Sequence, residues 1–163
     1  DGTVRFFRND GTPEKPAFTW ISGPENPFDA IASGSSITLA FADLDGDTDE
    51  DLAVVDYFGS STFWRKDGPN LFTAVTGIGN PLDGVLTGGQ GPQITFADVD
   101  GDSDLDLVAG FRYYPGEYLI MFENDGSSYV PNSTLQGLAP FGTGPNAPAF
   151  ANIDGDADLD LFL

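Results

Sequence analysis

The chain has 163 residues and is strongly acidic, with 26 aspartates and glutamates against 6 lysines and arginines, a net charge of −20 and a pI near 4.1. This charge disfavours nucleic acid and anionic membrane surfaces as partners and favours cations. The sequence contains no histidine and no cysteine. It therefore excludes disulfides, thiolate zinc sites, cysteine nucleophiles and any mechanism that needs an imidazole base.

The composition predicts a folded chain made of many short strands. Apolar residues make up 40% of the sequence, with 14 phenylalanines, which is enough for a core despite the acidity. The 21 glycines and 12 prolines suit strands and turns better than long helices, so we expect an all-β fold. No apolar run approaches the roughly 20 residues of a membrane span, so we expect no membrane insertion. The sequence begins at Asp1 without a charged and apolar leader. Either a signal peptide has been removed or the chain is a segment of something longer.

The expected strands are short apolar or aromatic runs bounded by turn residues. The first pair, 4–9 and 18–20, is joined through an Asp-Gly turn. Two groups of four follow, at 37–41, 52–55, 63–68 and 72–75, then at 94–96, 105–109, 121–126 and 129–130. The last pair is 149–150 and 159–163. Segments rich in glycine, proline, serine and asparagine connect these groups.

An acidic motif occurs three times at a nearly constant spacing. It reads FADLDGDTDEDL at 41–52, FADVDGDSDLDL at 96–107 and FANIDGDADLDL at 150–161, with first residues 55 and 54 apart. A weaker unit, an aromatic strand ending in Asp-Gly, follows the first two motifs and also stands near the N-terminus at 4–11. The chain therefore consists of three repeats of about 54 residues, and the cut falls inside one of them.

Each acidic motif predicts a calcium site. Positions one, three, five and nine would supply side-chain oxygens, and position seven a backbone carbonyl. Calcium takes 6 to 8 oxygen ligands in flexible geometry, whereas magnesium prefers to keep its waters. Without a cation, this many carboxylates would repel one another. The expected ligands of these three sites are Asp43, Asp45, Asp47, Asp49 and Asp51; Asp98, Asp100, Asp102, Asp104 and Asp106; and Asn152, Asp154, Asp156, Asp158 and Asp160.

Two other interpretations of the acidic motifs compete with a calcium site. One is a solvated acidic turn that binds nothing, and three copies at a fixed period, each bracketed by apolar strands, argue against it. The other is an EF-hand, which requires glycine at position six, glutamate at position twelve and flanking helices. Here glycine occupies position four and strands are expected on both sides, so we reject the EF-hand.

The motif FADLDGD with a following Asp-Leu, then an aromatic strand and an Asn-Asp-Gly turn, resembles the FG-GAP/VCBS repeat. That family forms calcium-binding blades of β-propellers, as in integrin alpha subunits and many bacterial surface and secreted proteins. The resemblance implies three four-stranded blades in a single domain, 1–163, with one blade split between 1–20 and 149–163. Two departures matter. Thr48, Ser103 and Ala157 replace a second glycine that is usual at position six, and Asn152 gives the third site a neutral ligand. We expect that third site to be the weakest.

The split blade suggests that another chain or segment completes it, because three blades cannot close a propeller, which typically has 4 to 8. Two chains could form a six-bladed ring, copies could add head to tail into a filament, or the chain could belong to a longer propeller or array. The first functional hypothesis is an extracellular calcium-binding structural or adhesion module, secreted or on the cell surface, that self-associates and has no catalytic activity.

A glycan-binding propeller is the alternative. It rests on the aromatic run with Tyr113, Tyr114 and Tyr118, matched in the first repeat by Tyr57 and Phe58. The competing interpretation is that these rings cover a sheet edge or a subunit interface. An enzyme is a third class, because a carboxylate pair can hydrolyse a glycosidic bond. With the acidic clusters assigned to metal, no isolated pair stands out, and we expect no catalysis.

Overall fold

The structure is a computed structural model that describes residues 2–33, 36–87, 89–112, 118–135, 138 and 147–163. The regular elements in these residues are β-strands and two short 3-10 helices, η1 (Gly23–Glu25) and η2 (Gly77–Gly79). All strand pairs are antiparallel. The expected all-β fold is therefore confirmed. None of the described residues forms a helix long and apolar enough to span a bilayer.

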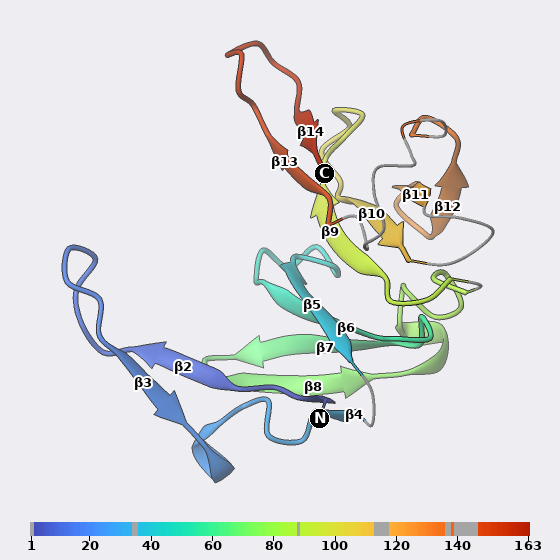
Figure 1. The fold of residues 1–163 in the computed structure, drawn as a ribbon. Coiled ribbons are helices and arrows are strands. Elements are labelled where there is room, and N and C mark those ends of the chain that lie inside the picture. The colour runs from blue at the N-terminus through green and yellow to red at the C-terminus, as the bar shows by residue number, and fades with distance from the viewer. Residues whose placement is uncertain (1, 34–35, 88, 113–117, 136–137, 139–146) are drawn as a thin grey trace.

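Two four-stranded sheets form the middle of the chain (Figure 1). The first contains β5 (Ile37–Ala42), β6 (Asp51–Asp56), β7 (Ser61–Gly68) and β8 (Leu71–Val75). The second contains β9 (Gln93–Ala97), β10 (Asp106–Phe111), β11 (Tyr118–Asn124) and β12 (Tyr129–Asn132). In both sheets the strands are hydrogen-bonded in chain order. These sheets are the two groups of four strands that the repeats predict.

The remaining strands form two-stranded sheets. They are β1 (Gly2–Thr3) with β4 (Ala32–Ser33), β2 (Phe6–Asn9) with β3 (Phe18–Ile21), and β13 (Ala149–Ala151) with β14 (Asp160–Phe162). The β2–β3 and β13–β14 hairpins lie at opposite ends of the molecule, with the four-stranded sheets between them (Figure 1). The two segments predicted to form the third repeat are thus separate two-stranded sheets, and no sheet closes on itself among the described residues. The β1–β4 pair was not expected from the sequence.

The second strand of each four-stranded sheet is its most buried element. The buried apolar side chains of these two strands are Leu52, Ala53, Val54 and Val55 in β6, and Leu107, Val108, Ala109 and Phe111 in β10. Successive side chains of a strand point to opposite faces, so each of these strands is covered on both faces. This double burial explains why both strands are continuous apolar runs in the sequence.

Apolar clusters join the sheets and hairpins in chain order. Phe6 packs edge-on against Phe28, with ring centroids 5.8 Å apart, and joins the N-terminal hairpin to the first sheet. Leu86, from the linker after β8, packs with Phe111 in the cluster between the two four-stranded sheets. Phe150 of β13 packs against the second sheet. The order of layers is therefore hairpin, sheet, sheet, hairpin, and in the described part of the chain each hairpin packs against one neighbouring layer.

Candidate metal centres in the acidic loops

The three acidic loops occupy the same place in their sheets. Loop 43–50 joins β5 to β6, loop 98–105 joins β9 to β10, and loop 152–159 joins β13 to β14. The ninth position is in each case the first residue of the strand that follows: Asp51, Asp106 and Asp160. Strands flank every loop, which agrees with the rejection of an EF-hand.

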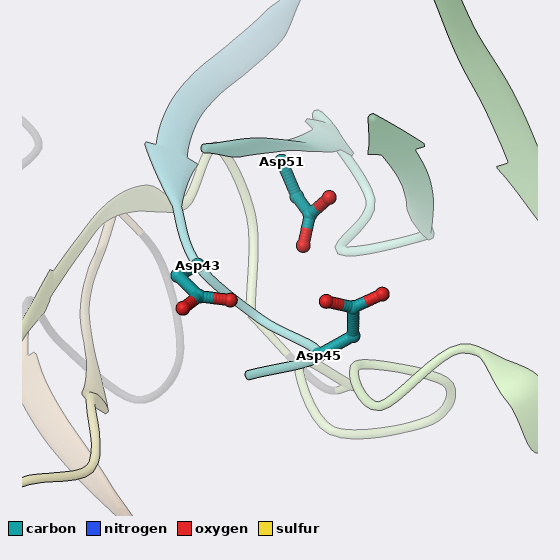
Figure 2. A group of neighbouring side chains, drawn as sticks. All are labelled: Asp43, Asp45 and Asp51. Atoms are coloured by element: carbon teal, nitrogen blue, oxygen red, sulfur yellow. The ribbon is translucent and has the colours of Figure 1, made fainter. Parts of the chain in front are cut away.

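Three carboxylates converge at the first loop. One oxygen from each of Asp43, Asp45 and Asp51 lies within 4.8 Å of the other two. Figure 2 shows these carboxylates pointing toward a common space from the end of β5, the loop and the start of β6. Asp51 is buried and Asp45 is exposed, so the space is anchored in the sheet and open to solvent. Three negative charges this close repel one another unless a cation lies between them.

The second loop forms a similar group. One oxygen from each of Asp98, Asp100 and Asp102 lies within 4.8 Å of the other two. The structure thus brings together positions one, three and nine in the first loop and positions one, three and five in the second. Asp47 and Asp106, which the sequence also predicts as ligands, lie outside these two groups.

Backbone N–H groups of each loop donate hydrogen bonds to the side chain at its first position. The Asp43 carboxylate accepts the Gly46 N–H at 2.8 Å on one oxygen and the Thr48 N–H at 2.9 Å on the other. Asp98 accepts the two corresponding N–H groups of the second loop at 2.7 and 3.1 Å. These contacts hold the loop in a tight turn with the first carboxylate directed inward.

Alternate aspartates continue this pattern along each loop. The carboxylate at position three accepts the N–H of position five, and the carboxylate at position five accepts the N–H of position seven. The pairs, acceptor first, are Asp45 with Asp47, Asp47 with Asp49, Asp100 with Asp102, Asp102 with Asp104, Asp154 with Asp156, and Asp156 with Asp158. All three loops therefore share these contacts between alternate aspartates and backbone N–H groups.

The aspartate at position nine ties the loop to the sheet. Asp51 accepts the Leu44 N–H at 3.0 Å and, on its other oxygen, the Lys66 N–H of β7 at 2.8 Å. Asp106 makes the two equivalent contacts at 3.0 Å each, with Asn124 of β11 as the second donor. The sequence predicts these aspartates only as ligands. Their second role cannot be found there, because both donors are backbone groups.

The second loop holds a buried carboxylate oxygen without a partner. Asp104 Oδ1, at position seven, is buried and forms no hydrogen bond. Desolvation, followed by the charges of nearby carboxylates, raises the pKa of Asp104. Desolvation also raises the pKa of Asp100 and of Asp51. A bound cation would give Asp104 its missing partner and would favour the charged form of all three side chains. The residues present therefore fit a metal ion.

The third loop gathers fewer charged oxygens. Asn152 Oδ1 accepts the Gly155 N–H at 2.7 Å, as the first aspartate does in the other loops. No three carboxylates of this loop come within 4.8 Å of one another among the described residues. Asp160 accepts the Ile153 N–H at 2.8 Å, but no donor from a third strand reaches it within the part of the chain that the structure describes. That the third site is the weakest stays a prediction.

A lysine stands beside the first loop. Lys66 Nζ donates a hydrogen bond to Asp49 Oδ1 at 2.6 Å, and this contact raises the pKa of the lysine. Asp49, at position seven, was predicted to contribute only its backbone carbonyl. In the second repeat Asn124 occupies the position of Lys66, so the corresponding Asp104 has no such ion pair.

The residue at position six has an unusual backbone conformation in two loops. Thr48 has φ of 76° and Ser103 has φ of 80°, which is the left-handed region that favours glycine. Ala157, in the third loop, is not among the residues with positive φ. The first two loops therefore hold a residue other than glycine in a conformation that favours glycine.

Replacing Thr48 with glycine is expected to stabilise the fold by about 1 kcal/mol, because a β-branched residue is strained at this φ and glycine is not. Urea denaturation in the presence of chelator measures the change without a contribution from metal binding. Ala157→Gly is the matched control, and it should be neutral or destabilising because no strain is relieved there. Equal losses of stability in both variants would contradict the strain at Thr48.

The structure describes only part of the aromatic run that was predicted to bind glycans. Tyr113 and Tyr114 lie outside the described residues, and Tyr118 is the first residue of β11. In the first repeat the Tyr57 hydroxyl donates to Gln90 at 2.9 Å, and the Tyr57 ring contacts Phe58 edge-on. Tyr57 therefore takes part in contacts within the chain.

Comparison with known proteins gives a match to a family model. Residues 43–109 match the family model of the FG-GAP-like repeat. This segment begins at the first ligand position of the first loop and includes β6 to β9, the second acidic loop and most of β10. No curated protein and no solved structure matches the chain significantly. The resemblance based on the acidic motifs is thus confirmed over residues 43–109, which are similar to the FG-GAP-like repeat.

Proposed function

We propose that this chain is an extracellular, calcium-binding structural or adhesion module that has no catalytic activity and associates with copies of itself. The observation that carries the proposal is the convergence of three carboxylates within 4.8 Å in each of the first two loops. Such groups are unfavourable without a cation and are well suited to holding one. The FG-GAP-like match covers both of these loops and supports the same conclusion.

Calcium fits the loops better than magnesium does. The ligands come from a continuous turn with several oxygens and an adjacent backbone, which suits the 6 to 8 flexible contacts of calcium. Magnesium demands octahedral geometry and retains most of its waters. The net charge of −20 adds a general attraction for divalent cations. Loops of this exposed kind suit the calcium concentrations outside cells, on the order of 10⁻⁴ to 10⁻³ M.

The layered sheets support a role in assembly. Two four-stranded meanders packed face to face resemble two blades of a propeller, and the two hairpins resemble the halves of a third. A ring of two chains, a head-to-tail filament and a place in a longer repeat array all complete such a blade. In each case calcium would rigidify the loops that join the first and second strands.

Calcium titration by isothermal calorimetry tests this function. Asp45→Asn and Asp100→Asn each remove one charge from a carboxylate group but keep the Oδ1 acceptor of the local backbone contact. Each substitution should remove or weaken one site at least tenfold, and the double variant should lose both. Asp83→Asn, an exposed aspartate outside the loops, is the control and should bind like the original chain. The absence of calcium binding at millimolar concentrations would overturn the proposal.

A further inference from the structure

The two end hairpins are equivalent to the two halves of a four-stranded sheet. β13 and β14 carry the acidic motif, as β5 and β6 do. β2 carries the aromatic strand and Asp-Gly turn found at β7 and β11. Side-chain contacts confirm this equivalence. Arg8 Nε donates to Asp10 at 2.6 Å, and Arg65 Nε donates to Asp67 at 2.8 Å.

The complete sheets define how the two halves would pair. Leu52 of β6 lies opposite Trp64 of β7, and Leu107 of β10 lies opposite Phe122 of β11. Transferred by the repeat, this register places Leu161 of β14 opposite Phe7 of β2. The same register places Phe162 opposite Phe6 and Leu163 opposite Arg5.

As far as the described residues go, the Asp160 carboxylate accepts one backbone N–H fewer than its counterparts Asp51 and Asp106. Asp51 and Asp106 each accept a second backbone N–H, from Lys66 and Asn124, in the third strand of their sheets. The residue of β2 equivalent to Lys66 and Asn124 is Asn9. A β2 strand placed next to β14 would therefore bring the Asn9 N–H to the free acceptor position of Asp160.

The outer face of the β2–β3 hairpin is apolar and uncovered. Phe7 is 52%, Trp20 63% and Phe18 68% exposed. These three side chains share one face, because Phe7 pairs with Trp20, and Phe18 pairs with Asn9 two residues along β2. The residues at the positions of Phe7 and Phe18 in the second sheet, Phe122 and Tyr129, are only 4% and 9% exposed. In that sheet they face the preceding layer.

The opposite hairpin exposes the complementary face. Phe162 of β14 is 45% exposed, whereas Val108, its counterpart in β10, is fully buried against the next layer. The two uncovered faces lie at opposite ends of the molecule (Figure 1), with two four-stranded sheets between them. One copy therefore does not join its own hairpins in this arrangement, but two copies arranged head to tail can do so.

We propose that β14 of one copy pairs antiparallel with β2 of a second copy, in the register that places Leu161 opposite Phe7 and the Asp160 carboxylate against the Asn9 N–H. The proposal deepens the self-association of the proposed function and rests on it. The pairing produces a four-stranded sheet in the order β13, β14, β2, β3 and covers Phe7, Phe18 and Trp20 with the second sheet of the first copy. It also removes two open strand edges.

Cysteine crosslinking tests the register directly, because the chain has no native cysteine. Two single variants, Leu161→Cys and Phe7→Cys, are purified separately, mixed in equal amounts with calcium and oxidised. Residues directly opposite each other in antiparallel strands have Cα atoms about 4.5–5.5 Å apart, which a disulfide can span. We expect a disulfide-linked species of twice the 17.3 kDa chain mass in the mixture and little in either variant alone.

A second pair and an off-register pair complete the design. Leu163→Cys with Arg5→Cys follows the same register. This pair leaves in place Leu161 and Phe7, the two apolar side chains that the contact would bury. Leu161→Cys with Arg8→Cys is the off-register control, since neighbouring side chains on β2 point to opposite faces. At least a tenfold excess of crosslinking in the two in-register mixtures over the control is expected.

Light scattering of the unmodified chain tests self-association by itself, independently of the register in which β14 and β2 pair. Large species by scattering, combined with equal crosslinking in all mixtures, would overturn the register while self-association stands. Monomers at about 100 µM without crosslinks would overturn both, and would assign the open edges to a segment outside these 163 residues. The calcium titration is independent of either result.

Discussion

Calcium at about 10 mM is expected to raise the melting temperature of this chain by about 10–20 °C over the chelated protein. An ion that binds only the folded state at about 100 times its dissociation constant adds about 2.7 kcal/mol per site. Two sites with dissociation constants of about 10⁻⁴ M would thus add about 5 kcal/mol. In a domain of this size, 1 kcal/mol corresponds to about 2–4 °C. Differential scanning calorimetry with calcium and with chelator measures the shift.

Ionic screening is the main alternative cause of such a shift, because a chain with a net charge of −20 repels itself. Sodium chloride at matched ionic strength and magnesium at the same concentration are therefore the controls. We expect both to produce a small fraction of the calcium effect. The Asp45→Asn and Asp100→Asn double variant should lose most of the calcium effect and keep the salt effect. An equal shift with sodium chloride would attribute the stabilisation to screening and remove the evidence for specific sites.

The strands could be predicted almost completely from the sequence. The repeat aligns three copies of each strand, so a weak local signal in one copy is reinforced by the others. β6 and β10 are continuous apolar runs because neighbouring layers cover both of their faces. The positions of the acidic loops could be predicted as well, because each motif lies between two strands that the repeat identifies.

Contacts that depend on tertiary placement could not be predicted. The β1–β4 pair joins Gly2–Thr3 to Ala32–Ser33, and such short segments carry no apolar alternation. Asp104 Oδ1 is buried without a hydrogen bond, whereas the motif predicts only the backbone carbonyl of this residue as a ligand. The positive φ of Thr48 opposes its intrinsic preference, because the two N–H contacts to Asp43 hold the turn. In each case the surrounding fold determines the local state.

Asp51→Ala is expected to lower the free energy of unfolding by about 2–5 kcal/mol, even in the presence of chelator. Asp51 is fully buried, and its carboxylate is the acceptor for the backbone N–H groups of Leu44 and Lys66. Alanine leaves both donors without this acceptor, and an unsatisfied buried donor costs about 1–3 kcal/mol. Urea denaturation of both proteins in chelator measures the loss directly.

Asp45→Asn is the matched comparison, because Asp45 lies in the same carboxylate group but is exposed, and its carboxylate accepts the Asp47 N–H within the loop rather than an N–H of β7. In chelator this variant should be as stable as the original chain or slightly more stable, since one repelling charge is removed. With calcium the order of stabilities changes. Both variants then lack one ligand of the ion, so Asp45→Asn also becomes less stable than the original chain. This pattern follows only if Asp51 supports the loop and also binds the ion, whereas Asp45 only binds the ion. Equal stability of the two variants in chelator would show that Asp51 has no structural role apart from the metal.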